Sequence, residues 1–257
     1  AVGNTACVIA EIFGDNCEFT IDNLVNASNI SNAASNLGGI IGFAEGTLIV
    51  KKVVLDNGKE NSPIALINRN VKSNIGSIIG QANDVILYEV ELDPDGIQIQ
   101  SDNLINYAQN EYYTGAIGGL IGQVNNLKFV KTEETKNRPI VVSDILFATS
   151  GKTNYMGGIV GKVTDTLEFD YSDDKLHCRY FDISNITIKG VGYLGGVAGY
   201  VKTLVEKHDE NDFANAITIS NVTIEETTDT KDNYYKELLE NESVYASTFG
   251  HIGGLYG

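Results

Sequence analysis

Side chains suited to acid–base or metal chemistry are few in this sequence and widely spaced. The histidines are His177, His208 and His251, and they occupy non-equivalent positions of the repeat described below. They therefore predict neither a catalytic triad nor a histidine-rich metal site. The cysteines form no CxxC or Cys/His pattern of the kind that binds zinc. We expect no metal ion and no other cofactor.

One group of carboxylates lies near basic residues in the sequence. Its members are Asp170, Asp173, Asp174 and Asp182, with Lys175 and Arg179 beside them. Some right-handed β-helix enzymes cleave acidic polysaccharides by means of a calcium ion, which carboxylates hold, and a basic residue. An acidic surface loop explains the same residues more simply, so we expect no enzyme. A carbohydrate-active enzyme that acts on acidic polysaccharide remains an alternative.

A five-residue glycine motif dominates the sequence. It has two glycines, two apolar residues and a third glycine, and it begins at residues 38, 76, 118, 157, 195 and 253, with Ser77 in the place of one glycine. Its glycines are Gly38, Gly39, Gly42, Gly76, Gly80, Gly118, Gly119, Gly122, Gly157, Gly158, Gly161, Gly195, Gly196, Gly199, Gly253, Gly254 and Gly257. The closing glycines, counted from Gly3 of a partial copy, are 39, 38, 42, 39, 38 and 58 residues apart. A period near 40 residues predicts a solenoid, a propeller or a tandem array.

Two further stretches keep phase with the motif. Short apolar stretches lie at 48–50, 85–88, 127–129 and 167–169, and alternating β-branched stretches lie at 19–24, 140–147, 181–188 and 217–224. Alternation with a period of two predicts half-buried strands. Asn23, Asp144, Asn185 and Asn221 interrupt the alternating stretches at matching points, which predicts stacked corners. Each repeat thus has a glycine strand, a short second strand and an asparagine-containing strand.

These patterns predict an all-β fold, a parallel β-solenoid of the right-handed β-helix type with about three strands per repeat of about 40 residues. Stacked repeats would place Ile40, Ile78, Leu120, Ile159, Val197 and Leu255 in one ladder, and Ile41, Ile79, Ile121, Val160, Ala198 and Tyr256 in the next. Residues 1–257 are expected to form a single solenoid, with a polar insertion at 225–247. The glycines suit sharp bends or the close approach of another backbone. A β-propeller is the alternative fold.

The motif resembles the GLUG repeat of bacterial and protist surface proteins. The closest copies are GGLIG at 118–122 and GGIVG at 157–161, and the resemblance extends over the whole chain. Ser77, Tyr256 in an apolar position and the long insertion depart from the pattern. The resemblance implies a β-solenoid that serves as a stalk or an adhesive surface. It carries no catalytic residues to this chain.

Composition limits the classes of partner. The net charge of −16 argues against binding to nucleic acid, which needs a basic face. No apolar run approaches the roughly 18 residues that span a bilayer. Five sequons, at Asn26, Asn29, Asn185, Asn221 and Asn241, are compatible with a glycosylated extracellular protein. Cys7 and Cys17 are candidates for a local disulfide.

We therefore expect a non-enzymatic structural or adhesive module of an extracellular surface protein, stalk or filament. Both ends of the chain fall inside a repeat, so we expect a segment of a longer polypeptide. The expected partners are neighbouring repeats, copies of the chain, or a host or matrix surface. A partner-binding module that uses the 225–247 insertion is a further alternative.

Overall fold

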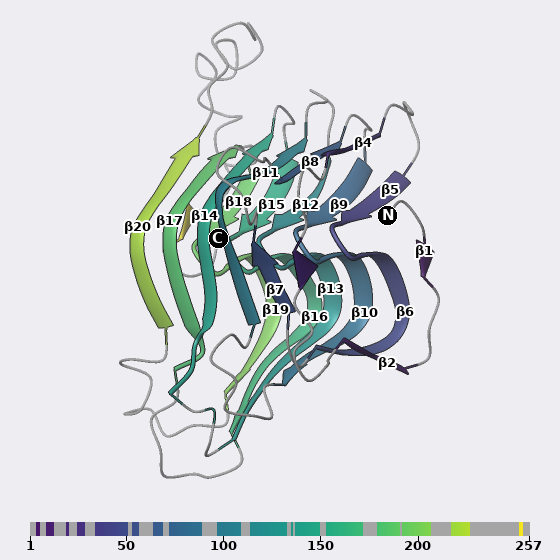
Figure 1. The fold of residues 1–257 in the computed structure, drawn as a ribbon, viewed down its shortest axis with the longest axis vertical. Coiled ribbons are helices and arrows are strands. Elements are labelled where there is room, and N and C mark those ends of the chain that lie inside the picture. Colours follow the sequence, from purple (N-terminus) through teal and green to yellow (C-terminus); the bar gives the residue numbers. More distant parts are fainter. Residues whose placement is uncertain are drawn as a thin grey trace, which may run out of the picture.

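The computed structural model describes residues 4–5, 9–12, 19–20, 25–28, 34–50, 53–56, 64–68, 72–88, 97–108, 114–132, 135, 137–149, 153–171, 179–190, 192–206, 217–226 and 252–253. Every regular element in these ranges is a β-strand, and every strand pair is parallel (Figure 1). The chain visits three sheets in turn and returns to the first one strand further along. The predicted parallel β-solenoid is confirmed, and the propeller, which is built from antiparallel blades, is wrong.

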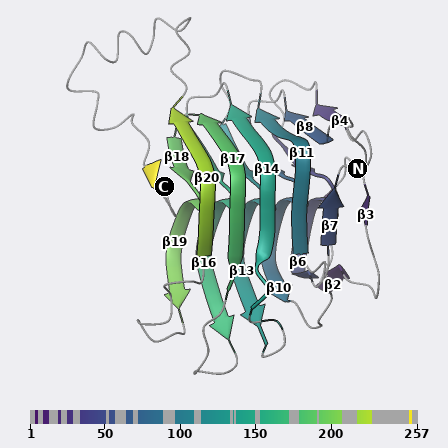
Figure 2. The ribbon, with the colours of Figure 1, turned by 60° about the vertical axis from the view of Figure 1, so that its left-hand side comes forward.

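Three sheets, here called A, B and C, form the solenoid (Figure 2). Sheet A contains, in spatial order, β1 (Asn4–Thr5), β6 (Ile41–Val50), β10 (Ile79–Tyr88), β13 (Ile121–Lys131), β16 (Val160–Tyr171) and β19 (Ala198–Glu206), and β2 (Ile9–Ile12) also pairs with β6. Sheet B contains β20 (Ile217–Glu226), β17 (Phe181–Gly190), β14 (Ile140–Thr149), β11 (Ile97–Ala108), β7 (Val53–Asp56) and β3 (Phe19–Thr20), and β8 (Ile64–Asn68) joins β11 to β4 (Val25–Ser28). Sheet C contains β21 (Ile252–Gly253), β18 (Gly192–Gly195), β15 (Thr153–Gly157), β12 (Thr114–Gly118), β9 (Lys72–Gly76) and β5 (Ala34–Gly38).

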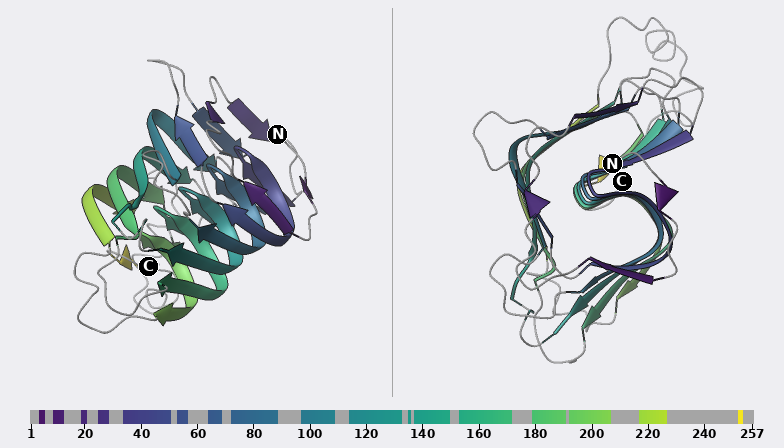
Figure 3. Two further views of the ribbon diagram at one scale, coloured as in Figure 1. Left: turned by 60° about the horizontal axis from the view of Figure 1, so that its bottom comes forward. Right: turned by 45° about the vertical axis from the view of Figure 1, so that its right-hand side comes forward.

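The predicted ladders hold across the described coils. Ile79 pairs with Ile41 on one side and with Ile121 on the other. In the adjacent ladder, the amide of Ile78 donates to the carbonyl of Leu120, and the amide of Ile159 donates to the carbonyl of Val197. Successive coils superpose in the end-on view (Figure 3, right). Leu255 and Tyr256 lie outside the described residues.

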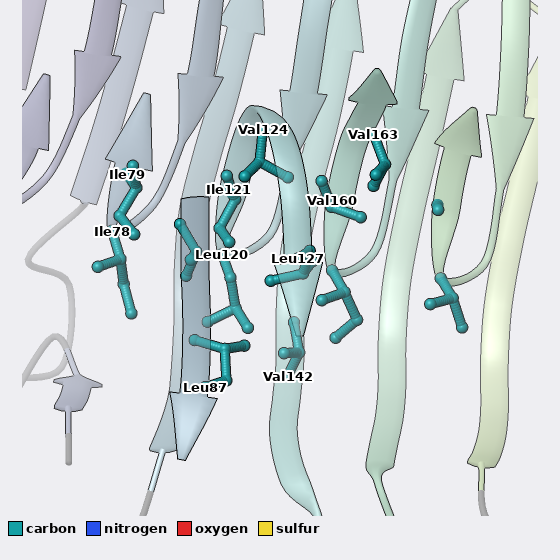
Figure 4. Close-up of a cluster of buried hydrophobic side chains, with 14 of the residues drawn as sticks. Ile78, Ile79, Leu87, Leu120, Ile121, Val124, Leu127, Val142, Val160 and Val163 are labelled. Atoms are coloured by element: carbon teal, nitrogen blue, oxygen red, sulfur yellow. The ribbon is translucent and has the colours of Figure 1, made fainter. Parts of the chain in front are cut away.

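The ladder side chains pack into a common core. Ile121, Val124 and Leu127 of β13 pair with their counterparts in the neighbouring coils. Val142 of sheet B belongs to the same buried cluster (Figure 4). These residues are at most 2 % exposed. Each buried aliphatic side chain contributes roughly 1.5–3 kcal/mol. These side chains are buried by neighbouring coils, so one repeat alone cannot complete the core.

The glycine motif is a bend between two strands. Sharp bends at the glycines were expected, but the single glycine strand predicted from the sequence is in fact two strands in different sheets. Strand β9 ends at Gly76 in sheet C, Ser77 and Ile78 form the bend, and β10 starts at Ile79 in sheet A. The predicted short second strand is the later half of β10, after a register shift between Ala82 and Asp84. Each coil still has three strands, but their boundary lies inside the motif. The bend also explains why both apolar residues of this copy, Ile78 and Ile79, are buried.

Candidate functional site

The glycines of the motif let two stretches of backbone lie in direct contact, and this contact positions the side chains on either side of the motif. A Cβ atom on Gly122 would lie 2.6 Å from the amide nitrogen of Ile75 and 2.5 Å from the carbonyl oxygen of Gly80. A Cβ atom on Gly161 would lie 2.6 Å from the amide nitrogen of Ile117. Among the described glycines only Gly192 has a positive φ, so the motif needs glycine for space and not for conformation. The backbone of sheet C therefore lies in direct contact with the first residues of the sheet A strands.

In three of the described copies, side-chain contacts show that the bend brings together the two residues that flank the motif. In the coil of β9 and β10, the amide Nδ2 of Asn74 donates to Oε1 of Gln81 at 2.9 Å and to Oδ1 of Asn36 at 3.0 Å. Two coils further along, the corresponding pair is Tyr155 and Lys162. Flanking pairs are seven residues apart in every described copy, at 36/43, 74/81, 116/123, 155/162 and 193/200. The scaffold thus presents a variable pair of side chains at a constant place in each coil.

In the later coils these flanking residues form a cluster of aromatic rings and one cation. We call Tyr155, Lys162, Tyr193 and Tyr200 the tyrosine–lysine cluster. The rings of Tyr155 and Tyr193 stack with centroids 5.0 Å apart, and Tyr200 stands edge-on to both, at 5.6 and 6.0 Å. Lys162 Nζ lies 4.0 Å from the centroid of Tyr155 and 5.7 Å from that of Tyr200. All four side chains are partly exposed.

The charge environment of Lys162 differs from that of two other lysines on sheet A. Burial lowers the pKa of Lys162, Tyr200 opposes this shift, and the positive charge of Lys72 reinforces it. In contrast, Lys128 Nζ lies 2.5 Å from a carboxylate oxygen of Asp170 and 3.3 Å from one of Glu168. The hydrogen bond to Asp170 is the main reason that the pKa of Lys128 is raised. Lys202 Nζ lies 3.4 Å from Asp165.

The carboxylates that suggested acid–base chemistry are not brought together by any described contact. Asp170 belongs to β16 in sheet A and binds Lys128, whereas Asp182 belongs to β17 in sheet B and lies 3.7 Å from Arg179. Asp173, Asp174 and Lys175 lie outside the described residues. No group of three or more potential metal ligands occurs within the part of the chain that is described.

The asparagine corners of sheet B have the predicted conformation. Asp144, Asn185 and Asn221 have φ values of 61°, 53° and 50°, in the left-handed region. Asn and Asp tolerate that region better than most residues. The Nδ2 atom of Asn221 donates to Oδ1 of Asn185 at 2.7 Å, so the corners are also linked from coil to coil. Both side chains are exposed. Asn23 lies outside the described residues.

Several other predicted residues also lie outside the described ranges. They are Cys7, Cys17, the three histidines, and the sequon residues Asn29 and Asn241. Asn26 lies in β4, of which only the backbone is described. Strand β20 ends at Glu226, and residues 227–247 of the predicted insertion lie outside the described residues.

The tyrosine–lysine cluster was not predicted from the sequence. The signal that identifies it is the pair of positions that flank the repeated motif, two residues before its first glycine and one after its last. The motif itself is nearly constant, whereas the flanking pair changes from amides to tyrosine and lysine.

No family model, curated protein or solved structure matches this chain. The resemblance to the GLUG repeat therefore stays a prediction. Among the described residues, no helix is long and apolar enough to cross a membrane.

Proposed function

We propose that this chain is a non-enzymatic structural and adhesive module of an extracellular surface protein, stalk or filament. The observation that carries the proposal is the residue-for-residue register between coils. Ile121 has its counterparts at Ile79 and Val160, and Leu127 has its counterparts at Val85 and Leu167. An array of this kind extends by adding coils without altering those already present, which suits a rod.

The side chains outside the core support the same role. Asn125 donates to Asn83 at 3.2 Å, Thr164 to Asn125 at 2.7 Å, and Asn126 to Asp84 at 2.7 Å. The Lys128 and Lys202 ion pairs likewise join neighbouring coils. Polar contacts of this kind fix the register and hold one coil against the next.

The alternative of a polysaccharide-cleaving enzyme has less support. A catalytic carboxylate needs access to its substrate and a pKa matched to its task. The described candidates, Asp170 and Asp182, are each paired with a cationic side chain, and they lie on different sheets, so no contact joins them in one site. Incubation of the chain with acidic polysaccharide and calcium tests this alternative, and shortening of the polymer would support it.

Electron microscopy of the native, full-length material tests the proposed rod. We expect an elongated stalk or filament whose diffraction has a repeat of about 4.8 Å along its axis, the spacing of stacked strands. A short, compact particle without this axial repeat would contradict the proposal.

A further inference from the structure

Lys162 carries a partly buried positive charge, and no carboxylate lies beside it among the described residues. Its ammonium lies over Tyr155, whereas Lys128 and Lys202 each bind a carboxylate from an adjacent coil. Acidic residues are abundant in a chain of net charge −16. A scarcity of acidic residues therefore does not explain why no described carboxylate lies beside Lys162. A partly dehydrated ammonium without a counter-ion is a favourable place for an anion from solution.

A second cation strengthens this local field. Lys72 of β9 is exposed, and its charge is near enough to lower the pKa of Lys162. Two cations that repel one another stabilise an anion placed between or beside them. The surroundings of Lys162 are thus locally positive on an acidic protein, which favours a negatively charged ligand.

The tyrosines determine what kind of anion fits. No described group hydrogen-bonds the hydroxyls of Tyr155 and Tyr200, and both rings are partly exposed. Tyrosine offers a rigid apolar ring and a polar tip at a small cost in conformational entropy. A ligand with apolar C–H surface, hydroxyls and a negative group matches these features, and an acidic sugar has all three.

An extended peptide fits less well. Peptides that add to a sheet need unpaired backbone groups at a strand edge. Strand β15 already pairs with β12 and β18, and β16 pairs with β13 and β19. The cluster therefore offers side chains and no free strand edge, which favours a saccharide over a peptide.

We propose that the tyrosine–lysine cluster binds an acidic saccharide, with the carboxylate or sulfate of the sugar at Lys162 and the sugar ring against the tyrosines. The inference deepens the adhesive part of the proposed function and rests on it. Tyr155 and Tyr193 belong to successive coils, as do Lys162 and Tyr200. A linear polysaccharide along the axis would therefore contact one coil after another.

Binding of the full 257-residue chain to immobilised polysaccharides tests the proposal. Polygalacturonate supplies carboxylates, heparin supplies sulfates, dextran is neutral, and polyglutamate is an acidic peptide. We expect binding to polygalacturonate or heparin, which identifies the anionic group, and little binding to dextran or polyglutamate. Equal binding to dextran or stronger binding to polyglutamate would overturn the proposed ligand class, as would no binding to either acidic polysaccharide.

Matched variants connect binding to the cluster. Lys162→Met keeps the apolar stem and is expected to weaken binding about tenfold or more, because a charge-assisted contact is lost. Tyr200→Phe keeps the ring and is expected to weaken binding about threefold or more. Lys202→Gln, on the neighbouring coil, should change binding less than about twofold. Equal losses in the two lysine variants would indicate non-specific attraction and overturn the site.

Two controls separate this inference from the rod proposal. Thermal melting of each variant establishes whether the solenoid is intact. If Lys162→Met lowers the melting temperature and leaves binding unchanged, the lysine is structural and the site is wrong. A filament by electron microscopy with no saccharide binding would contradict the site alone, whereas saccharide binding by a compact native particle would contradict the rod alone.

Discussion

At the scale of single residues, the glycines act through the space they leave. A Cβ atom on Gly122 would overlap the backbones of Ile75 and Gly80, neither of which can rotate away. We expect Gly122→Ala to lower the free energy of unfolding by about 3 kcal/mol, measured by urea denaturation. Gln123→Ala changes the next residue, which is partly exposed, and should cost less than about 1 kcal/mol. Equal losses of stability in the two variants would show that the close backbone packing at Gly122 does not determine the stability of the fold.

The asparagine corners depend on conformation instead. Asn185 has a φ of 53°, a region that a β-branched residue adopts only with strain. We expect Asn185→Val to lower the free energy of unfolding by about 2 kcal/mol, from this strain and the lost hydrogen bond with Asn221. Asn185→Gly loses the same hydrogen bond without the strain and should cost about 1 kcal/mol or less. Indistinguishable thermal melts of the two variants would contradict this account.

At the scale of elements, the bend buries apolar side chains at positions where a charge would be costly. Ile159 is fully buried within it, and its carbonyl accepts a hydrogen bond from the amide of Leu120 at 2.8 Å. We expect Ile159→Asp to destabilise the fold by about 4 kcal/mol or more, because the carboxylate has no described partner there. Loss of the strand signal in circular dichroism, or a much lower melting temperature, measures the effect. Thr203→Asp, at an exposed position of β19, is the matched control, and an unshifted melt for Ile159→Asp would contradict the register.

The same element shows how far the sequence alone could lead. The period, the ladders and the corners were predictable, because each repeats a local pattern whose physical requirement is the same in every coil. The contact between Tyr155 and Lys162 was not predictable from the glycine stretch read as one strand. Seven residues of extended strand span about 23 Å, which would keep these side chains apart. The bend reverses the chain, and only the folded coil places Lys162 Nζ 4.0 Å from the ring.

At the scale of the whole molecule, stability is expected to vary along the axis. Strands β16 and β17 have described neighbours on both sides, whereas β20 pairs with β17 alone in the described structure. Ile183 and Ile188 of β17 are fully buried, while their partners Ile219 and Ile224 of β20 are only partly buried. In a linear array each coil is stabilised by its nearest neighbours, so opening should begin where neighbours are fewest.

Hydrogen exchange measured by mass spectrometry tests this gradient. We expect peptides from β16 and β17 to exchange at least about tenfold more slowly than the peptide of β20, because their opening requires more contacts to break. Ile186→Ala leaves a cavity in β17 and should accelerate exchange in the adjacent β20 more than in the distant β10. Equal protection of β17 and β20, or equal acceleration in β20 and β10, would mean that the solenoid opens as one cooperative unit. That result would replace the nearest-neighbour account with an all-or-none transition of the whole chain.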